Sequence, residues 1–160
     1  MIHWLPARLH RALLPLAHRL RHRWRRWRKI PIAGVSVILT NPQGQVLLLR
    51  HSYGPPVWAL PGGGLGVREE PEAAARREVR EELAHTLGQI EAIALIEEVI
   101  SGSPHTAHLF AATICDTPQP DGREIIAARF FPLDDLPSDL GRTTAARLAL
   151  WRDWAVSEQG

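Results

Sequence analysis

Three glutamates, Glu78, Glu81 and Glu82, stand at spacings that bring their carboxylates together if this stretch is helical. On a helix, positions i, i+3 and i+4 share one face, and their Cβ atoms lie roughly 5–6 Å apart. Like charges crowded in this way oppose folding unless a cation neutralises them. Carboxylates are hard oxygen ligands that suit Mg²⁺ or Mn²⁺. The spacing therefore suits a divalent-metal site with ligand positions left for water and phosphate oxygens.

A glycine run, Gly62-Gly63-Gly64, precedes these glutamates. Glycines let a backbone come close to an anionic ligand or a metal, and a helix N-terminus behind them helps to hold phosphate. The alternative is a solvated helix face on which the glutamates pair with Arg76, Arg77 and Arg80. For three glutamates alone that alternative is favoured, so the surrounding pattern must decide between the two.

The element that must carry the glutamates is a helix over residues 71–83. Pro71 suits its first position, and Glu69, Glu70 and Glu72 lie near the positive end of its dipole. Small and β-branched residues predict a buried strand over 31–40, and a turn signal at 41–44 predicts a hairpin with a strand over 45–50. The pattern further predicts a short extended piece at 58–60, strands over 89–100, 105–115 and 123–131, a loop or short helical turn over 132–140, and a helix over 142–156. This order of elements predicts a mixed α/β domain with helices packed on a sheet.

With the motif spacing counted out, the segment resembles a known family. Five residues separate Gly63 from Glu69, seven more lead to Arg77, and Arg77-Glu78-Val79-Arg80-Glu81-Glu82 follows. This is similar to the signature of the Nudix hydrolase family, and the stretches Trp58 to Gly64 and Arg129 to Pro137 also resemble it. The resemblance runs from about Ile32 to the C-terminus. It implies an α/β fold, a Nudix-type α/β/α sandwich with a mixed sheet, over residues 30–160.

Two positions depart from the family pattern, which has glycine and then an aliphatic residue after the glutamate pair. This chain has Ala84 and His85 there. The glycine normally ends the helix, where a left-handed backbone conformation is useful. Because alanine is a poor replacement, we expect the helix to run on towards Gly88, with little effect on carboxylates that lie one turn earlier.

The resemblance implies roles residue by residue. Glu78, Glu81 and Glu82 would hold the divalent metal, Mg²⁺ or alternatively Mn²⁺, and the carbonyl of Gly62 or Gly63 would complete its shell. Arg77 would orient the carboxylates by charge-assisted hydrogen bonds, with Glu69 in support.

The family also places a further catalytic glutamate in a later loop or strand. Glu124 is the preferred candidate, with Glu97 and Glu98 as competitors.

The implied reaction is hydrolysis of a diphosphate linkage in a nucleoside diphosphate derivative or a nucleoside triphosphate. The metal would neutralise phosphate oxygens and lower the pKa of water, which attacks phosphorus while a glutamate takes the proton. The alternative is a non-catalytic Nudix-fold module that senses a nucleotide. Intact glutamates at every motif position argue against it, because a pure binder has no need of three converged carboxylates.

Charge divides the chain in two. Residues 1–29 contain eight arginines and Lys29 but no acidic residue, whereas residues 30–160 carry ten basic and 17 acidic side chains, a net charge of −7. The basic balance therefore belongs to the first segment and gives little reason to expect sequence-specific nucleic-acid binding.

An apolar stripe at helical spacing marks residues 1–29 as a basic amphipathic helical arm, interrupted at Pro15. The stripe consists of Leu5, Leu9, Leu13, Leu16, Leu20, Trp24 and Trp27. Such an arm could dock on the domain, support a homodimer, or lie on an anionic membrane surface. The expected location is cytoplasmic, with a membrane-peripheral location as the alternative.

The single cysteine, Cys115, excludes an intramolecular disulfide and any multi-cysteine zinc site. Its apolar neighbours predict a buried, inert thiol.

Overall fold

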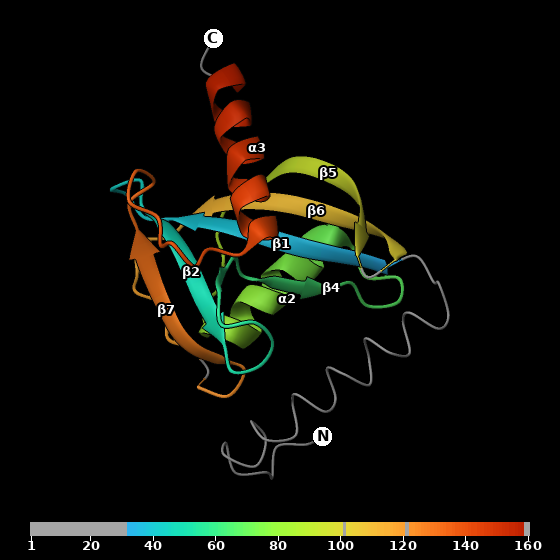
Figure 1. Cartoon of the computed structure of the whole chain (residues 1–160), viewed down its shortest axis with the longest axis horizontal. Coiled ribbons are helices and arrows are strands. Elements are labelled where there is room, and N and C mark those ends of the chain that lie inside the picture. The colour runs from blue at the N-terminus through green and yellow to red at the C-terminus, as the bar shows by residue number, and fades with distance from the viewer. Residues whose placement is uncertain (1–31, 101, 121, 159–160) are drawn as a thin grey trace.

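The computed structural model describes residues 32–100, 102–120 and 122–158, so the arm predicted at residues 1–29 lies outside the described residues. Within them, seven strands and two helices follow one another along the chain (Figure 1). The strands are β1 (Ile32–Thr40), β2 (Val46–His51), β3 (Trp58–Ala59), β4 (Gly62–Gly64), β5 (Glu91–Ile100), β6 (Ser103–Thr113) and β7 (Ile125–Phe131), and the helices are α2 (Pro71–Leu83) and α3 (Arg142–Glu158).

A mixed sheet organises the domain around β1. This strand runs parallel to β6 along its whole length and antiparallel to β4 and β2 on its other side. Beyond β6 lies β5, and beyond β2 lie β3 and β7. The predicted mixed α/β architecture is confirmed, but the predicted hairpin is minimal, because β1 and β2 share only the pair Thr40 and Val46 while β2 pairs with β7 over most of its length.

The two faces of the sheet bury separate cores, because successive side chains of a strand point to opposite sides. On one face, Val35, Val37 and Leu39 pack with apolar residues of α2. On the other face, Ile38 packs with Leu148 of α3. Helices α2 and α3 therefore cover opposite faces, which gives the predicted α/β/α sandwich (Figure 1).

The glycine run forms a strand that the sequence pattern did not predict. Gly62, Gly63 and Gly64 constitute β4 and pair with Ser36, Val35 and Gly34 of β1. The run is fixed by backbone pairing to the central strand, and it lies beside the helix that carries the glutamates.

The expectation that α2 runs on towards Gly88 is wrong. The helix ends at Leu83, and Ala84 itself takes the left-handed conformation, with φ 52° and ψ 29°. The Ala84 N–H donates to the Arg80 carbonyl at 3.0 Å, so alanine itself forms the left-handed cap that glycine usually supplies. Contacts from elsewhere in the chain accompany this end: the Gln119 N–H donates to the Leu83 carbonyl at 3.1 Å, and Arg76 Nη1 donates to the carbonyls of Leu87 and Gly88 at 2.7 and 2.9 Å.

The prediction of a buried thiol at Cys115 is also wrong, because Cys115 is exposed. Strand β6 ends at Thr113, and Ile114 is buried with its N–H bonded to the Thr40 carbonyl at 2.8 Å. The next side chain along the chain turns outward to solvent.

Among the described residues, none of the helices has both the length and the apolar character needed to cross a membrane.

We predict that Ala84→Gly stabilises the fold, since glycine removes the steric cost of a left-handed alanine, about 1–2 kcal/mol. The expected rise in the free energy of unfolding, measured by urea denaturation, is about 1 kcal/mol. The matched control is Ala149→Gly, the same change at an exposed site within α3, which should cost about 1 kcal/mol. A loss of stability in both variants would contradict the assigned helix end.

Candidate active site

The three glutamates of α2 lie in different environments. Glu82 is buried, with 6% of its surface exposed, and its Oε2 accepts a hydrogen bond from the Gly62 N–H at 3.0 Å. The side chain of Glu78 is 15% exposed, whereas that of Glu81 is 60% exposed. The acidic face therefore runs from a buried end against β4 to an open end at Glu81.

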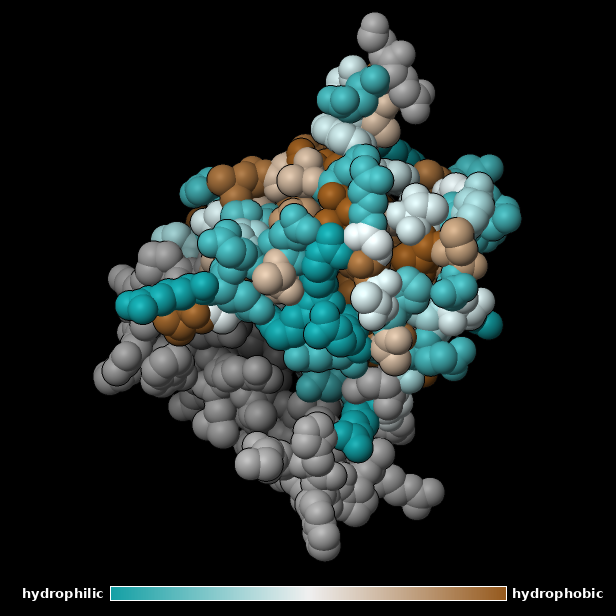
Figure 2. Space-filling model, turned by 180° about the vertical axis from the view of Figure 1, so that it is seen from behind, coloured by the Kyte–Doolittle hydropathy of each residue, from teal (hydrophilic) through white to brown (hydrophobic). Residues whose placement is uncertain are grey.

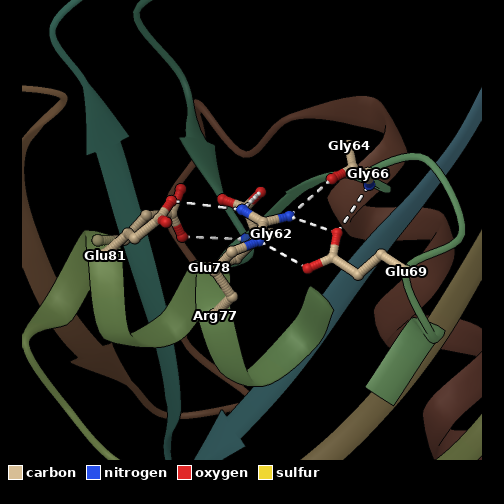
Figure 3. Close-up of polar contacts among 8 residues, drawn as sticks. Gly62, Gly64, Gly66, Glu69, Arg77, Glu78 and Glu81 are labelled. Atoms are coloured by element: carbon tan, nitrogen blue, oxygen red, sulfur yellow. Dashed lines mark hydrogen bonds and ion pairs between the residues drawn. The ribbon is translucent and has the colours of Figure 1, made fainter. Parts of the chain in front are cut away.

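Arg77 joins this face to the loop between β4 and α2. Its Nε and Nη2 donate to the two carboxylate oxygens of Glu69 at 2.8 and 3.0 Å, and Nη2 also donates to the Gly64 carbonyl at 3.0 Å (Figure 3). Its Nη1 donates to Glu78 at 2.8 Å and to Glu81 at 3.3 Å. One planar guanidinium thus fixes both the loop and two of the carboxylates, a geometry that the fork of arginine donors allows.

Glycine is required at two positions of β4 because there is no room for a side chain. A Cβ at Gly63 would lie 2.5 Å from the Cδ of Glu78, inside its carboxylate. A Cβ at Gly62 would lie 3.0 Å from the Cα of Ser36 and closer still to the Val35 carbonyl, and Gly62 has a φ of 149°. The backbone of β4 therefore lies directly against the acidic face.

The electrostatics of the site follow from these contacts. The hydrogen bond from Arg77, helped by one from the Gly66 N–H, lowers the pKa of Glu69 to about 2, so this carboxylate stays charged. Glu78 behaves in the opposite way: desolvation by burial raises its pKa, and the neighbouring charges of Glu81 and Glu124 raise it further, against the opposing effect of Arg77. Burial and the neighbouring carboxylates thus disfavour the charged form of Glu78, and Arg77 offsets this only in part.

Comparison with known proteins agrees with this geometry. A family model described as the NUDIX domain matches residues 31–151. The chain belongs to the Nudix family. The resemblance inferred from the motif spacing is therefore confirmed.

Individual relatives of this Nudix domain match over shorter stretches. An RNA pyrophosphohydrolase of Rhodospirillum rubrum is 44% identical over 50 residues, which is 31% of this chain and 30% of the relative. Mouse diphosphoinositol polyphosphate phosphohydrolase 3-alpha is 35% identical over 74 residues, 46% of this chain and 44% of the relative. The chain thus aligns with less than half the length of these curated relatives.

Solved structures match the fold as a whole. A MutT Nudix hydrolase from Burkholderia pseudomallei has a TM-score of 0.68 at 27% identity, covering 76% of this chain and 98% of the other. The Nudix domain of NrtR from Shewanella oneidensis, solved with ADP ribose, also has a TM-score of 0.68, at 20% identity, covering 78% of this chain and 88% of the other.

The candidates for the later glutamate of the Nudix site separate in the structure. Glu124 precedes β7, where its carbonyl accepts the Ser52 N–H at 2.8 Å, and its charge acts on Glu78. Glu98 instead lies at 2.7 Å from Arg147 and 3.0 Å from His105, on the face of the sheet that α3 covers. Glu97 is exposed on β5. Of the three, Glu124 is the one that influences the acidic face.

The metal site expected of a Nudix enzyme fits these residues in part. The close contact between Gly63 and the Glu78 carboxylate, and the like charges around Glu78, form a cradle that suits a hard cation. In this structure, however, no three acidic, histidine or cysteine side chains of the described ranges converge to hold an ion. The carboxylates of Glu78 and Glu81 accept hydrogen bonds from Arg77, and the carboxylate of Glu82 accepts one from the Gly62 N–H. Binding a cation therefore requires these carboxylates to exchange partners.

Sequence patterns did not reveal a polar cluster on the opposite face. Arg147 of α3 donates to Ser36 of β1 and to Glu98 of β5, and Glu98 also contacts His105 of β6. His105 is only 12% exposed as a side chain, although its strand position alone favours a surface residue. These residues are far apart in the chain, so local spacing carries no signal for them.

We predict that Gly63→Ala lowers hydrolytic turnover by at least about tenfold while the melting temperature changes little, because the added methyl displaces the Glu78 carboxylate rather than backbone. Gly64→Ala is the matched control, since a Cβ at Gly64 meets nothing within 4 Å. Turnover and thermal unfolding of both variants test this. Equal turnover in the two would show that the contact between Gly63 and Glu78 has no part in the reaction.

Proposed function

We propose that this Nudix protein is a divalent-metal-dependent hydrolase that cleaves a diphosphate linkage in a nucleoside diphosphate derivative or a nucleoside triphosphate. Water attacks phosphorus, and no covalent enzyme intermediate forms. The observation that carries the proposal is the acidic face of α2 held against β4, where the Gly62 N–H binds the buried Glu82 and the Gly63 backbone lies against the Glu78 carboxylate. A cation bound there would stabilise the neighbouring carboxylates, and a diphosphate would bring further oxygen ligands to it.

In the proposed site, Glu78, Glu81 and Glu82 hold Mg²⁺, or alternatively Mn²⁺, with the carbonyl of Gly62 or Gly63. When bound, the metal neutralises phosphate oxygens and activates water for in-line attack. Glu82 is positioned by the Gly62 N–H, and the exposed Glu81 faces the side from which solvent and substrate arrive.

Arg77 and Glu69 position the site without acting on the substrate. The pKa of Glu69 near 2 keeps it anionic, so the pair stays intact across the neutral range and holds the loop of Gly64 and Gly66 in place. Glu124 is the proposed general base, because it is the later glutamate whose charge reaches Glu78.

The relatives support the diphosphate as the common feature of the substrate. Their names specify RNA and diphosphoinositol polyphosphate, and one structural neighbour is complexed with ADP ribose. These molecules differ in base, sugar and size, whereas a chain of linked phosphates is what they share. The site therefore recognises the phosphate chain of its substrate.

The second candidate is a non-catalytic module that binds a nucleotide derivative. The complex of the NrtR Nudix domain with ADP ribose favours it, because that domain has the same fold. The neighbouring carboxylates of Glu78, Glu81 and Glu82 on one helix argue against it, since a binder of an anionic ligand gains nothing from carboxylates that repel both one another and the ligand.

We predict that hydrolysis requires a divalent cation. A panel of nucleoside diphosphates, nucleoside triphosphates, nucleotide sugars and dinucleotides should show product release with Mg²⁺ or Mn²⁺ and none in excess chelator. In heavy-oxygen water, the label should appear on one product phosphate. Full activity in chelator, or label only on carbon-bound oxygen, would remove the basis of the proposal.

Variants of the acidic face separate the enzyme from the binding module. Glu81→Gln and Glu82→Gln should each reduce turnover by at least about 10², since each removes a metal ligand and its charge. Glu72→Gln on the same helix is the control, because Glu72 pairs with Arg76 away from this face. If the wild-type chain binds substrates of the panel but hydrolyses none of them, the binding module is favoured over the enzyme.

We also predict that Glu124→Gln reduces turnover by about 10²–10⁴ with little change in substrate KM, as expected for loss of a general base. The control is Glu97→Gln, at an exposed glutamate of β5, which should leave turnover near the wild-type value. Steady-state kinetics of the two variants measure this. A normal turnover in Glu124→Gln would show that Glu124 is not the general base.

A further inference from the structure

One face of β5 remains uncovered in the described part of the chain. Leu95, Glu97 and Val99 alternate along β5 and point to the side of the sheet that α2 covers, because Leu95 pairs with His108 and His108 pairs with Val35 of the α2 core. Leu95 is 60% exposed and Val99 is 73% exposed. Helix α2 packs on β1, β4 and β6, and β5 lies beyond them at the end of the sheet. Leu95, Glu97 and Val99 form what we name the β5 patch.

Exposed apolar side chains on the last strand of a sheet, whose outer backbone groups have no further strand to pair with among the described residues, offer a place for another segment to pack. Figure 2 shows that brown, hydrophobic residues interrupt the hydrophilic surface of the domain in several places. In the β5 patch, Val99 and Leu95 flank the exposed Glu97, so a matching partner offers apolar side chains together with basic ones.

Residues 1–29 have that composition, and the described part of the chain begins near this patch. Ile32 of β1 pairs with His105 of β6, and His105 pairs with Glu98 of β5. Two strand spacings, about 10 Å, therefore separate Ile32, the first described residue, from Glu98. Trp27 precedes Ile32 by five residues, which span up to about 17 Å. The tryptophan end of the apolar stripe can therefore reach the β5 patch.

The other face of the sheet does not suit the arm. There Arg147 of α3 already contacts Glu98 and Ser36, and α3 packs over Ile96. An arginine-rich segment on that side would meet Arg147 and a core that is already filled. On the α2 side, the neighbours Ala33 and Thr106 are only half-buried, and Glu97 is unshielded.

We propose that residues 1–29 dock by their apolar stripe on the β5 patch of the same chain, with arginines beside Glu97 and the net negative body. Nine basic residues in the arm complement the net charge of −7 in residues 30–160. Docking there would cover the end of the sheet.

Photo-crosslinking in the full-length chain tests the proposal. A benzoylphenylalanine at position 99 should crosslink to peptides from residues 1–29, whereas one at position 156, a 75% exposed site on α3, should not. A mixture of light and ¹⁵N-labelled protein distinguishes crosslinks within a chain from those between chains. Crosslinks between chains would assign the patch to a second copy, and no crosslink from position 99 to the arm would overturn the proposal.

The membrane alternative is an outcome of the same experiment. Repeating it with phosphatidylcholine vesicles and with 3:1 phosphatidylcholine–phosphatidylserine vesicles should leave the crosslinking yield unchanged and the protein in the supernatant. Salt-sensitive sedimentation with the anionic vesicles, accompanied by loss of the crosslink, would assign the arm to a lipid surface instead.

Charge substitution in the patch supplies a second, independent measurement. Leu95→Lys with Val99→Lys should lower the melting temperature by about 3–6 °C, because lysines would then face the arginines of the arm. Edge strands ordinarily tolerate lysine, so an unchanged melting temperature would contradict a covered patch. Val156→Lys is the control and should leave the melting temperature unchanged.

Discussion

The site depends on the hydrogen bonds of one guanidinium. Arg77 makes five of them, to both oxygens of Glu69, to Glu78, to Glu81 and to the Gly64 carbonyl. These bonds raise the pKa of Arg77 further above its already high value, Glu69 contributing most. A lysine has three donors on a point charge and cannot join a loop, a supporting carboxylate and two further carboxylates at once. The acidic face of α2 is tolerable in the fold because this arginine is beside it.

The second constraint is that the loop facing the glutamates is a strand. Pairing of β4 with β1 fixes the carbonyls of Gly62 and Gly63 relative to the central strand, so the backbone side of the site is as rigid as the sheet. Because these glycines have no side chains, α2 packs closely on β4. The Glu78 carboxylate then lies against Gly63, and the Gly62 N–H bonds Glu82. The site therefore combines backbone fixed by sheet pairing on one side with carboxylates held by Arg77 and by the Gly62 N–H on the other.

Local pattern predicted the parts of this molecule that local forces decide. Pro71 and the acidic first turn placed the start of α2, and the spacing of Glu78, Glu81 and Glu82 placed the acidic face. The same reasoning was wrong at Ala84, because alanine there adopts the left-handed cap that glycine usually supplies, next to hydrogen bonds from Gln119 and Arg76 that only the folded chain brings to this place. Two further features depend on which strands become neighbours. Residues Gly62–Gly64 form a strand because they pair with β1, and the charge of Glu124 acts on Glu78 because the fold brings the two side chains near one another. Propensity contains no information on those pairings.

The polar cluster on the far face shows how the two sides of the sheet are connected. Ser36, which accepts a hydrogen bond from Arg147, is the β1 partner of Gly62, whose N–H in turn holds Glu82. A charged group buried without partners is costly, and Arg147 reduces that cost by donating from its Nη atoms to Ser36 and Glu98, although its Nε has no hydrogen-bond partner in the described part of the chain. The hydrogen bonds of Arg147 hold α3 beside the part of β1 that pairs with β4. The same short stretch of β1 therefore sets the positions of α3 and of the acidic face. Val35 packs in the core on the α2 side, and Ser36 accepts a hydrogen bond from Arg147 of α3.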